Sequence, residues 1–447
     1  MRPHALTLGL MLCGLTATRL PGVPAPPYTL EELVEAAVAA NAAVLEVGWK
    51  VREAQAQLAQ ARAAYLLPRL RLESEAGLVP DAEGDLFTPP ADTTGWRTLG
   101  PFSRHELQFV QPLYTFGQLD SRRQAAIHGV SVGEADLAQA RLDVAHRVRE
   151  LYWGVLLARD LDGLAARLSK AIDEKLAEVD VDETLDVSDR YQLKLALVEL
   201  GLQRGTVARK LELAWSALRW ESGLPAGAPL ELEAEGLEPV ALRLAPLKEV
   251  TRRALAHRPD WRKLQAGLAA RKEQADAARS AFFPSFYLAG GVRYAVAPGR
   301  TDQHNPFIKD EFNYLNAGAF LGMRQSLEWP MLRADAAKAD AVYRQLRAKE
   351  TSAVEGVELD VRRAYTDHQQ AAAEMAAADE SRKLARQWVQ EAQDDYELDP
   401  ASLDDLVAAF QAWATREKAY YEAVYAHNLA LAELERKAGG APLGEQP

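Results

Sequence analysis

Histidine and carboxylate side chains are the groups of this sequence that could bind a metal ion or move protons. The eight histidines are scattered, and no two stand four residues apart, the spacing that puts two imidazoles on one helical face. Acidic pairs are plentiful, but they fall in stretches with helical patterning, where a solvated surface explains them. The sequence contains no Glu-x-x-His motif, nucleophile motif or phosphate-binding loop. We therefore expect no enzyme, no cofactor and no resident metal.

Composition and charge narrow the possible partners. The chain has 447 residues, of which 48% are hydrophobic and 26% charged, and its net charge is −12. A negative chain repels phosphate backbones, so a nucleic-acid partner is excluded. After the N-terminal segment, no stretch reaches the 18 or so apolar residues that a membrane-spanning helix needs.

The first residues have the pattern of a signal peptide. Arg2 supplies a positive charge, residues 6–15 are apolar, and small residues follow at Ala17 and Ala25. Cys13, the single cysteine, lies inside this segment. We therefore expect an exported chain whose mature form has no disulfide bond.

A heptad pattern occurs twice, once in each half of the chain. Val44, Val51, Leu58 and Tyr65 recur every seven residues, and Trp261, Leu268, Ala275 and Phe282 repeat the pattern in the same register. A period of 3.5 is typical of helices that pack as coiled coils. The first copy is predicted as one helix from Leu30 to Leu66. The chain is therefore predicted to consist of two structural repeats.

A proline ends each heptad helix, and the period then changes to two. After Pro68, Leu70 and Leu72 alternate with charged residues, Leu78 continues the same face, and a similar period of two follows Pro284. Pro68 and Pro284 are therefore the predicted helix–strand junctions. The alternation fits a membrane β-strand with one lipid face and one wet face, and it also fits an amphipathic strand in a soluble sheet.

Each half continues with a returning strand and two long helices. The β-hairpins are predicted at about 67–115 and 284–328, the first with a loop over 79–103. Long helices are expected over 117–181 and 332–398, each about 100 Å long at 1.5 Å per residue, with return helices over 189–222 and 403–438. Polar turns at Asp182-Glu183 and Asp399-Pro400 are the predicted helical tips.

These elements give five segments. We expect a signal peptide over residues 1–25, a first repeat over 26–224, a linker over 225–246, a second repeat over 247–438 and a disordered C-terminal tail over 439–447. Four membrane strands cannot close a barrel, because the smallest closed membrane barrels have eight strands. An open strand edge cannot face lipid, so several chains would have to share one barrel.

The sequence resembles the TolC-like outer-membrane efflux protein family. The resemblance rests on residues 254–259 (ALAHRP), on the segments 61–68 and 278–284 before the strands, on residues 111–117 (QPLYTFG), and on residues 396–406 near the second tip. It covers nearly all of the chain after the signal peptide. It implies a mainly α-helical fold with a membrane β-barrel contribution: a homotrimer whose strands form one 12-stranded barrel in outer-membrane lipid above a helical barrel.

The resemblance also implies a function and partners. Such proteins are outer-membrane exit ducts of tripartite efflux or type I secretion systems, and they conduct substrates passively from the periplasm to the exterior. They work with a periplasmic adaptor protein and an inner-membrane pump or ABC transporter. The residues alone leave one alternative open, a soluble periplasmic coiled-coil scaffold or adaptor.

The resemblance suggests a gate as well. In the family, a ring of aspartates lines the closed periplasmic tip, and Asp405 matches that position, with Asp404 beside it. A ring of carboxylates would attract cations and act as a selectivity filter. Ser402-Leu403-Asp404-Asp405 also resembles a capping box, so gating and helix capping both stay open for these two residues.

The chain departs from the family at the tips and at one junction. Asp182-Glu183 and Asp399-Pro400 stand where a glycine commonly allows the tight turn that helps adaptor docking. In the second half, Glu328-Trp329-Pro330 replaces the glycine-containing turn at Thr115-Phe116-Gly117. We therefore expect the two strand-to-helix junctions to differ in shape.

Overall fold

A computed structural model describes residues 27–87, 98–181, 187–224, 229–398 and 403–445. The predicted signal peptide lies outside these residues. The chain divides into two compact units, each of which draws on both sequence repeats. The first unit comprises Met1–Ala42, Val144–Val240 and His368–Ala432, and the second comprises Ala43–Asp143, Ala241–Asp367 and Glu433–Pro447. The repeat boundaries themselves stay a prediction.

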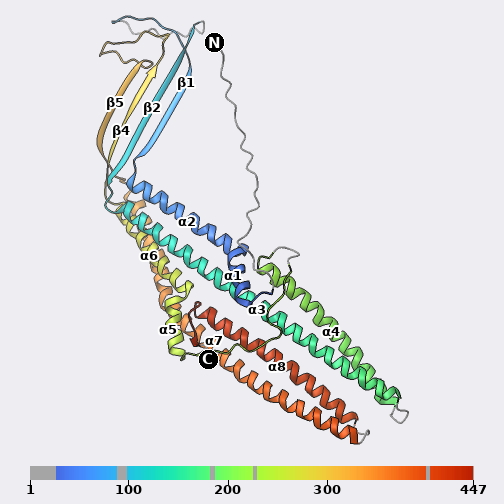
Figure 1. Cartoon of the computed structure of the whole chain (residues 1–447). Helices are drawn as coiled ribbons and strands as arrows, with labels where there is room; N and C mark the ends of the chain where they lie inside the picture. The colour runs from blue at the N-terminus through green and yellow to red at the C-terminus, as the bar shows by residue number, and fades with distance from the viewer. Residues whose placement is uncertain (1–26, 88–97, 182–186, 225–228, 399–402, 446–447) are drawn as a thin grey trace. The chain divides into compact units, whose positions relative to one another are not determined.

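The second unit contains one four-stranded antiparallel sheet (Figure 1). Its strands are β1 (Arg69–Pro80), β2 (Leu99–Tyr114), β4 (Ser285–Val296) and β5 (Tyr314–Arg324), in the order β1-β2-β4-β5. The two hairpins join where β2 pairs with β4. The predicted loop over 79–103 is too long, because pairing continues to Pro80 and Leu99. Strands β1 and β5 are the open edges of this sheet.

The strand register separates polar from apolar side chains. Directly paired residues of antiparallel strands share a face. Pairing of Glu73 with Glu106, and of Glu106 with Arg293, places these charges on one face together with their alternate neighbours. The opposite face carries residues that are mostly apolar: Leu70, Leu72, Leu78, Leu107, Phe109, Leu288, Val292, Leu315, Leu321 and Met323. Many are largely exposed, with Leu70 at 68% and Leu321 at 77%.

Four long helices follow the strands, as predicted. They are α3 (Gln118–Val181), α4 (Val187–Glu221), α7 (Trp329–Leu398) and α8 (Leu403–Lys437). Alanine and leucine at helical spacing with few interruptions explain their length. Within the first unit, α7 and α8 run side by side. None of the described helices contains a stretch long and apolar enough to cross a membrane.

The helix predicted from Leu30 to Leu66 is in fact two helices. Helix α1 (Leu30–Ala40) ends at Asn41, whose backbone is extended, and α2 (Ala42–Leu66) follows. Asn41 is buried, and its Nδ2 donates a hydrogen bond to the carbonyl of Glu221 at 3.2 Å. In the second repeat, Arg258 likewise separates α5 (Leu247–His257) from α6 (Pro259–Ser280), because a residue before proline avoids the helical conformation.

The C-terminal tail is not disordered as predicted over its described residues. Strand β6 (Gly444–Glu445) pairs with β3 (Arg243–Leu244), which lies in the predicted linker. Ala441 and Leu443 are buried. The carbonyl of Pro442 accepts a hydrogen bond from Arg253 at 2.6 Å. These contacts order the described part of the C-terminal segment, which was expected to be disordered.

Candidate gate and strand–helix junctions

The predicted tip turns lie outside the described residues. Asp182 and Glu183 fall in the gap between α3 and α4, and Asp399 and Pro400 fall in the gap between α7 and α8. The description of α8 begins at Leu403, so its backbone places the two candidate gate residues.

Asp404 and Asp405 occupy the first turn of α8, and both are exposed. Carboxylates at a helix N-terminus are stabilised by the partial positive charge of the backbone there, by roughly 0.3–1 kcal/mol each. This position suits the capping role. Exposure leaves the same carboxylates able to attract cations.

An apolar cluster packs directly behind the acidic turn. Leu406 and Ala409 of α8 are buried against Ala392 of α7, and Val389, Tyr396, Val407 and Phe410 pack around them. The alternation along α8 is abrupt, since exposed Asp405 is followed by buried Leu406. This packing fixes the direction in which α8 leaves the tip, and so positions the two aspartates.

A buried carboxylate joins the same two helices further along. Glu417 of α8 is fully buried, and its Oε1 accepts a hydrogen bond from Arg386 of α7 at 2.6 Å. A second α7 arginine, Arg382, lies 3.6 Å from Glu417 and stacks over the ring of Tyr420 at 3.5 Å. Hydrogen bonds from Lys383 and Arg382 lower the pKa of Asp379 on the same helix. The Glu417 cluster (Glu417, Arg382, Arg386, Tyr420) fixes the register of α7 against α8.

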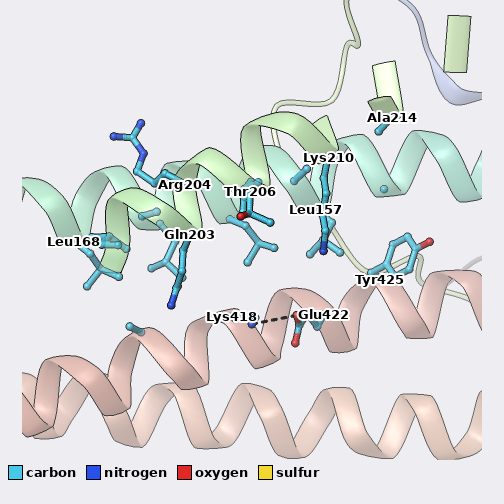
Figure 2. Close-up of a pocket in the computed structure, with 18 of the residues that line it drawn as sticks. Leu157, Leu168, Gln203, Arg204, Thr206, Lys210, Ala214, Lys418, Glu422 and Tyr425 are labelled. Atoms are coloured by element: carbon cyan, nitrogen blue, oxygen red, sulfur yellow. Dashed lines mark ion pairs between the residues drawn. The ribbon is translucent and has the colours of Figure 1, made fainter. Parts of the chain in front are cut away.

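A groove runs along α3, α4 and α8 within the first unit, with a volume of about 1020 Å³ (Figure 2). Its lining includes apolar side chains such as Leu157 and Leu168 of α3. Polar side chains also line it, including Lys210 of α4 and the ion pair of Lys418 with Glu422 on α8 at 3.8 Å. These groups form a helix-packing surface and bring together no acid–base or nucleophilic constellation.

The first strand-to-helix junction turns through two left-handed residues. Phe116 has φ 50° and Gly117 has φ 85°, a conformation that glycine adopts readily and phenylalanine rarely. Ring contacts hold Phe116 there, because it lies 4.7 Å from Tyr114 and stacks on Phe283 at 5.0 Å.

The second junction has a different shape, as predicted. Helix α7 begins at Trp329, and none of the described residues between β5 and α7 has a positive φ. The indole of Trp329 stacks on Phe282 at 6.3 Å. Pro68 and Pro284 each lie between the end of a helical segment and the start of a strand, before β1 and β4 respectively.

Sequence reasoning missed two of these groups. The aromatic residues beside the junctions (Tyr65, Tyr114, Phe116, Phe282, Phe283 and Trp329) are a signal that could have been read, since aromatics collect at both ends of membrane strands. Glu417 gave no such signal, because one more glutamate in an acidic helix looks like a solvated residue.

A comparison with protein families decides which family this architecture represents. The profile of the family described as "Outer membrane efflux protein" matches residues 33–179 and 250–440, which is most of the chain. The chain belongs to the outer membrane efflux protein family. The two matched stretches fall one in each predicted repeat, which agrees with the internal duplication.

Solved structures of outer membrane efflux proteins share the fold. MtrE, the outer membrane channel of Neisseria gonorrhoeae, matches with a TM-score of 0.75 at 20% identity, covering 92% of this chain and 88% of the other. CusC matches with a TM-score of 0.74 at 18% identity, covering 92% of both chains. CmeC, the outer membrane channel of Campylobacter jejuni, matches with a TM-score of 0.73 at 17% identity, covering 93% and 86%. A comparison with curated proteins found no match.

Family membership settles the coarse classification. The outer membrane efflux protein family is a family of transport channels and not of enzymes, and its members reside in the outer membrane. The mainly helical fold with strand hairpins in two repeats is therefore the fold expected from the resemblance. The exit-duct prediction fits these findings better than the soluble scaffold.

Proposed function

We propose that this chain is the exit duct of a tripartite efflux or type I secretion system. Three copies would share one 12-stranded barrel in outer-membrane lipid and one helical barrel in the periplasm. Substrate would pass through by passive conduction, with energy supplied by an inner-membrane pump or ABC transporter that reaches the duct through a periplasmic adaptor.

The two-faced sheet is the observation that carries this proposal. One face presents Arg69, Arg71, Glu73, Arg104 and Arg293, and the opposite face presents the exposed leucines and valine described above. A soluble protein would bury such an apolar face or lose solubility. Lipid on the apolar face and water on the charged face satisfy both sets of side chains.

The open edges of the same sheet favour several copies. Within the described part of the chain, strands β1 and β5 each leave a row of backbone groups without a ladder partner. Unpaired backbone groups in lipid cost several kcal/mol each. Pairing β1 of one copy with β5 of the next would satisfy both edges and extend the sheet by four strands per copy.

An apolar stripe on α4 supports association of the helices as well. Its members are exposed at helical spacing: Tyr191, Leu195, Val198 and Leu202. Four large apolar side chains on one helical face predict a packing partner. A neighbouring copy would cover this stripe when the helices of several chains form a tube.

The gate of the duct is proposed at the first turn of α8. Asp404 and Asp405 are exposed there, and three copies would bring six carboxylates to one constriction. Such a ring would attract cations and repel anions. Helix capping by the same residues is compatible with this role.

Membrane fractionation with native electrophoresis tests the proposal. The protein is expected in outer-membrane extracts, as a species of three chains that dissociates to one chain on heating in SDS. Release of the protein by osmotic shock without detergent would contradict the duct and favour the scaffold. A matched control is the same extract heated before loading.

A further inference from the structure

Two buried histidines face each other between α7 and α8 in the first unit. The exposed fraction is 6% for His368 of α7 and 7% for His427 of α8. Their ring centroids lie 4.8 Å apart, with the planes at 65° in an edge-to-face arrangement. Neither residue belongs to the candidate gate, since His368 lies 30 residues before the end of α7 at Leu398.

The histidine pair also meets the segment that links the two repeats. Nε2 of His427 lies 3.3 Å from the carbonyl oxygen of Val240. The neighbouring Asn428 is fully buried, accepts a hydrogen bond from the Val240 N–H at 2.9 Å, and donates one to the carbonyl of Glu238 at 2.8 Å. Three separate segments, α7, α8 and residues 238–240, therefore meet at the two imidazole rings.

The ring nitrogens of the two histidines make fewer hydrogen bonds than they could. Both ring nitrogens of His368 and Nδ1 of His427 are buried, with no hydrogen-bond partner among the residues that the structure describes. A neutral imidazole with unused nitrogens loses solvation that no hydrogen bond replaces, and an imidazolium in the same place would lose far more.

Asp367, the carboxylate next to His368 in the sequence, is exposed and pairs with Arg363 at 3.8 Å. The residues one turn away from each imidazole on its own helix carry no charge. Residues one turn before and after His427 on α8 are Ala423, Val424, Ala430 and Leu431. On α7, the corresponding neighbours of His368 are Ala364, Tyr365, Ala371 and Ala372. The linking segment contributes Glu238, whose side chain is exposed. His427 is the titratable group whose ring contacts the ring of His368, with the centroids 4.8 Å apart.

Burial, and then the neighbouring His427, lower the pKa of His368 below its ordinary value near 6.5. The folded packing therefore binds fewer protons than an opened one between that lowered pKa and about 6.5. The stability that neutral His368 contributes to this packing is fully present above about pH 6.5. It decreases as the pH falls from about 6.5 toward the lowered pKa.

We propose that His368 and His427 form a proton-sensitive joint that opens the contact between α7, α8 and residues 238–240 in acid. A proton from water binds a ring nitrogen that has no acceptor nearby, and the resulting imidazolium gains hydration only when the helices part. The partner imidazole at 4.8 Å resists a second charge, so one proton per joint is enough to favour opening.

The joint would change how α7 and α8 lie at the tip. Both helices continue from the joint toward the acidic turn at Asp404 and Asp405. Loosening the contact at His368 and His427 would let the ends of α7 and α8 near Asp404 and Asp405 shift. Acid would then alter the conduction of the duct. This consequence rests on the proposed function, whereas opening of the joint itself does not.

Hydrogen–deuterium exchange of the full chain, extracted in detergent, tests the joint directly. The backbone amides of Glu238 and Val240 and of the helical turns around His368 and His427 are measured at pH 7.5, 6.5 and 5.5. The rates are corrected for the intrinsic pH dependence of exchange. Their corrected exchange should accelerate by up to about tenfold per pH unit below about 6.5. The readout stays informative even if the protein conducts nothing.

Three variants make the exchange experiment decisive. His368→Leu removes the titratable ring and should abolish the acid response. Should that variant fail to assemble, His368→Gln removes the ring but keeps a polar side chain, and it should lose the response as well. His304→Gln changes an exposed loop histidine and should keep the full response. Acid-independent exchange in the unaltered protein, or an unchanged response in the His368 variants, would overturn the proposal.

Discussion

Asp404 and Asp405 combine two properties, a position in the first turn of a helix and exposure to solvent. The first property contributes to helix stability and the second to ion attraction. Replacing both carboxylates with amides removes the charge that acts in both effects, so the two are separated by measuring them independently. Loss of the charge at the helix N-terminus should cost about 0.3–1 kcal/mol of stability per residue, whereas loss of a gate should change ion block.

We expect Asp404→Asn combined with Asp405→Asn to weaken cation block of the open channel. Loss of two negative charges per copy should raise the Mg²⁺ concentration for half-block at least about tenfold, which corresponds to ~1.4 kcal/mol. Single-channel recording in planar bilayers measures this. Glu355→Gln with Glu358→Gln, an exposed pair on α7, is the charge-matched control. Equal block in all three proteins would leave capping as the only role of the aspartates.

The Glu417 cluster gives a second prediction at this scale. Arg386→Met should destabilise the protein by about 2–3 kcal/mol, because the fully buried carboxylate keeps only the longer contact with Arg382. Arg363→Met removes an exposed ion pair with Asp367 at 3.8 Å and should cost under about 0.5 kcal/mol. Thermal unfolding followed by circular dichroism compares the two. Equal melting temperatures would show that the Glu417 cluster does not fix the helix register.

At the scale of elements, each strand residue must suit the surroundings of the face on which it lies, lipid on the apolar face and water on the charged face. Leu72 in β1 is 69% exposed on the apolar face, and Glu73 next to it lies on the charged face. Leu72→Arg should reduce outer-membrane assembly, since a cation at mid-membrane costs about 2–4 kcal/mol. Glu73→Arg should be tolerated, because it replaces a like-charge pairing with Glu106. Quantification of the heat-modifiable oligomer tests both, and equal yields would contradict the assignment of faces.

The strand-to-helix junctions give a prediction about backbone conformation. Gly117→Ala places a side chain at φ 85° and should destabilise the first junction by about 1 kcal/mol. Gly129→Ala is the control, because a Cβ at that helical position meets nothing within 4 Å and should stabilise α3 by about 0.5–1 kcal/mol. Opposite shifts of the melting temperature are expected, and two shifts of the same sign would contradict this account of the turn.

Periodicity made the long elements predictable from sequence. A seven-residue period predicts a helix such as α2 or α6, and a two-residue period predicts a strand such as β1, because each depends on neighbours along the chain. The break at Asn41 depends on the distant carbonyl of Glu221, and strand β6 depends on β3. The Glu417 cluster and the histidine pair likewise depend on residues of two helices that the sequence alone does not bring together.

At the scale of the whole molecule, the sequence and the sheet both require several copies to associate through the open edges of the sheet. Family membership assigns the chain to the outer membrane, and its four strands leave β1 and β5 with open edges. Pairing of these edges between copies explains the edges, the two-faced sheet and the exposed stripe on α4 together. A closed ring of three copies is therefore the central claim.

Cysteine cross-linking between the two edge strands tests that claim most directly. Ser74→Cys in β1 is combined in turn with a cysteine at position 315, 317 or 319 of β5, all on the same face of the sheet. Oxidation of the assembled protein should give, for at least one pairing, a covalent species of three chains and nothing larger on non-reducing gels. Monomer alone in every pairing, or a ladder that continues beyond three chains, would contradict a closed trimeric barrel.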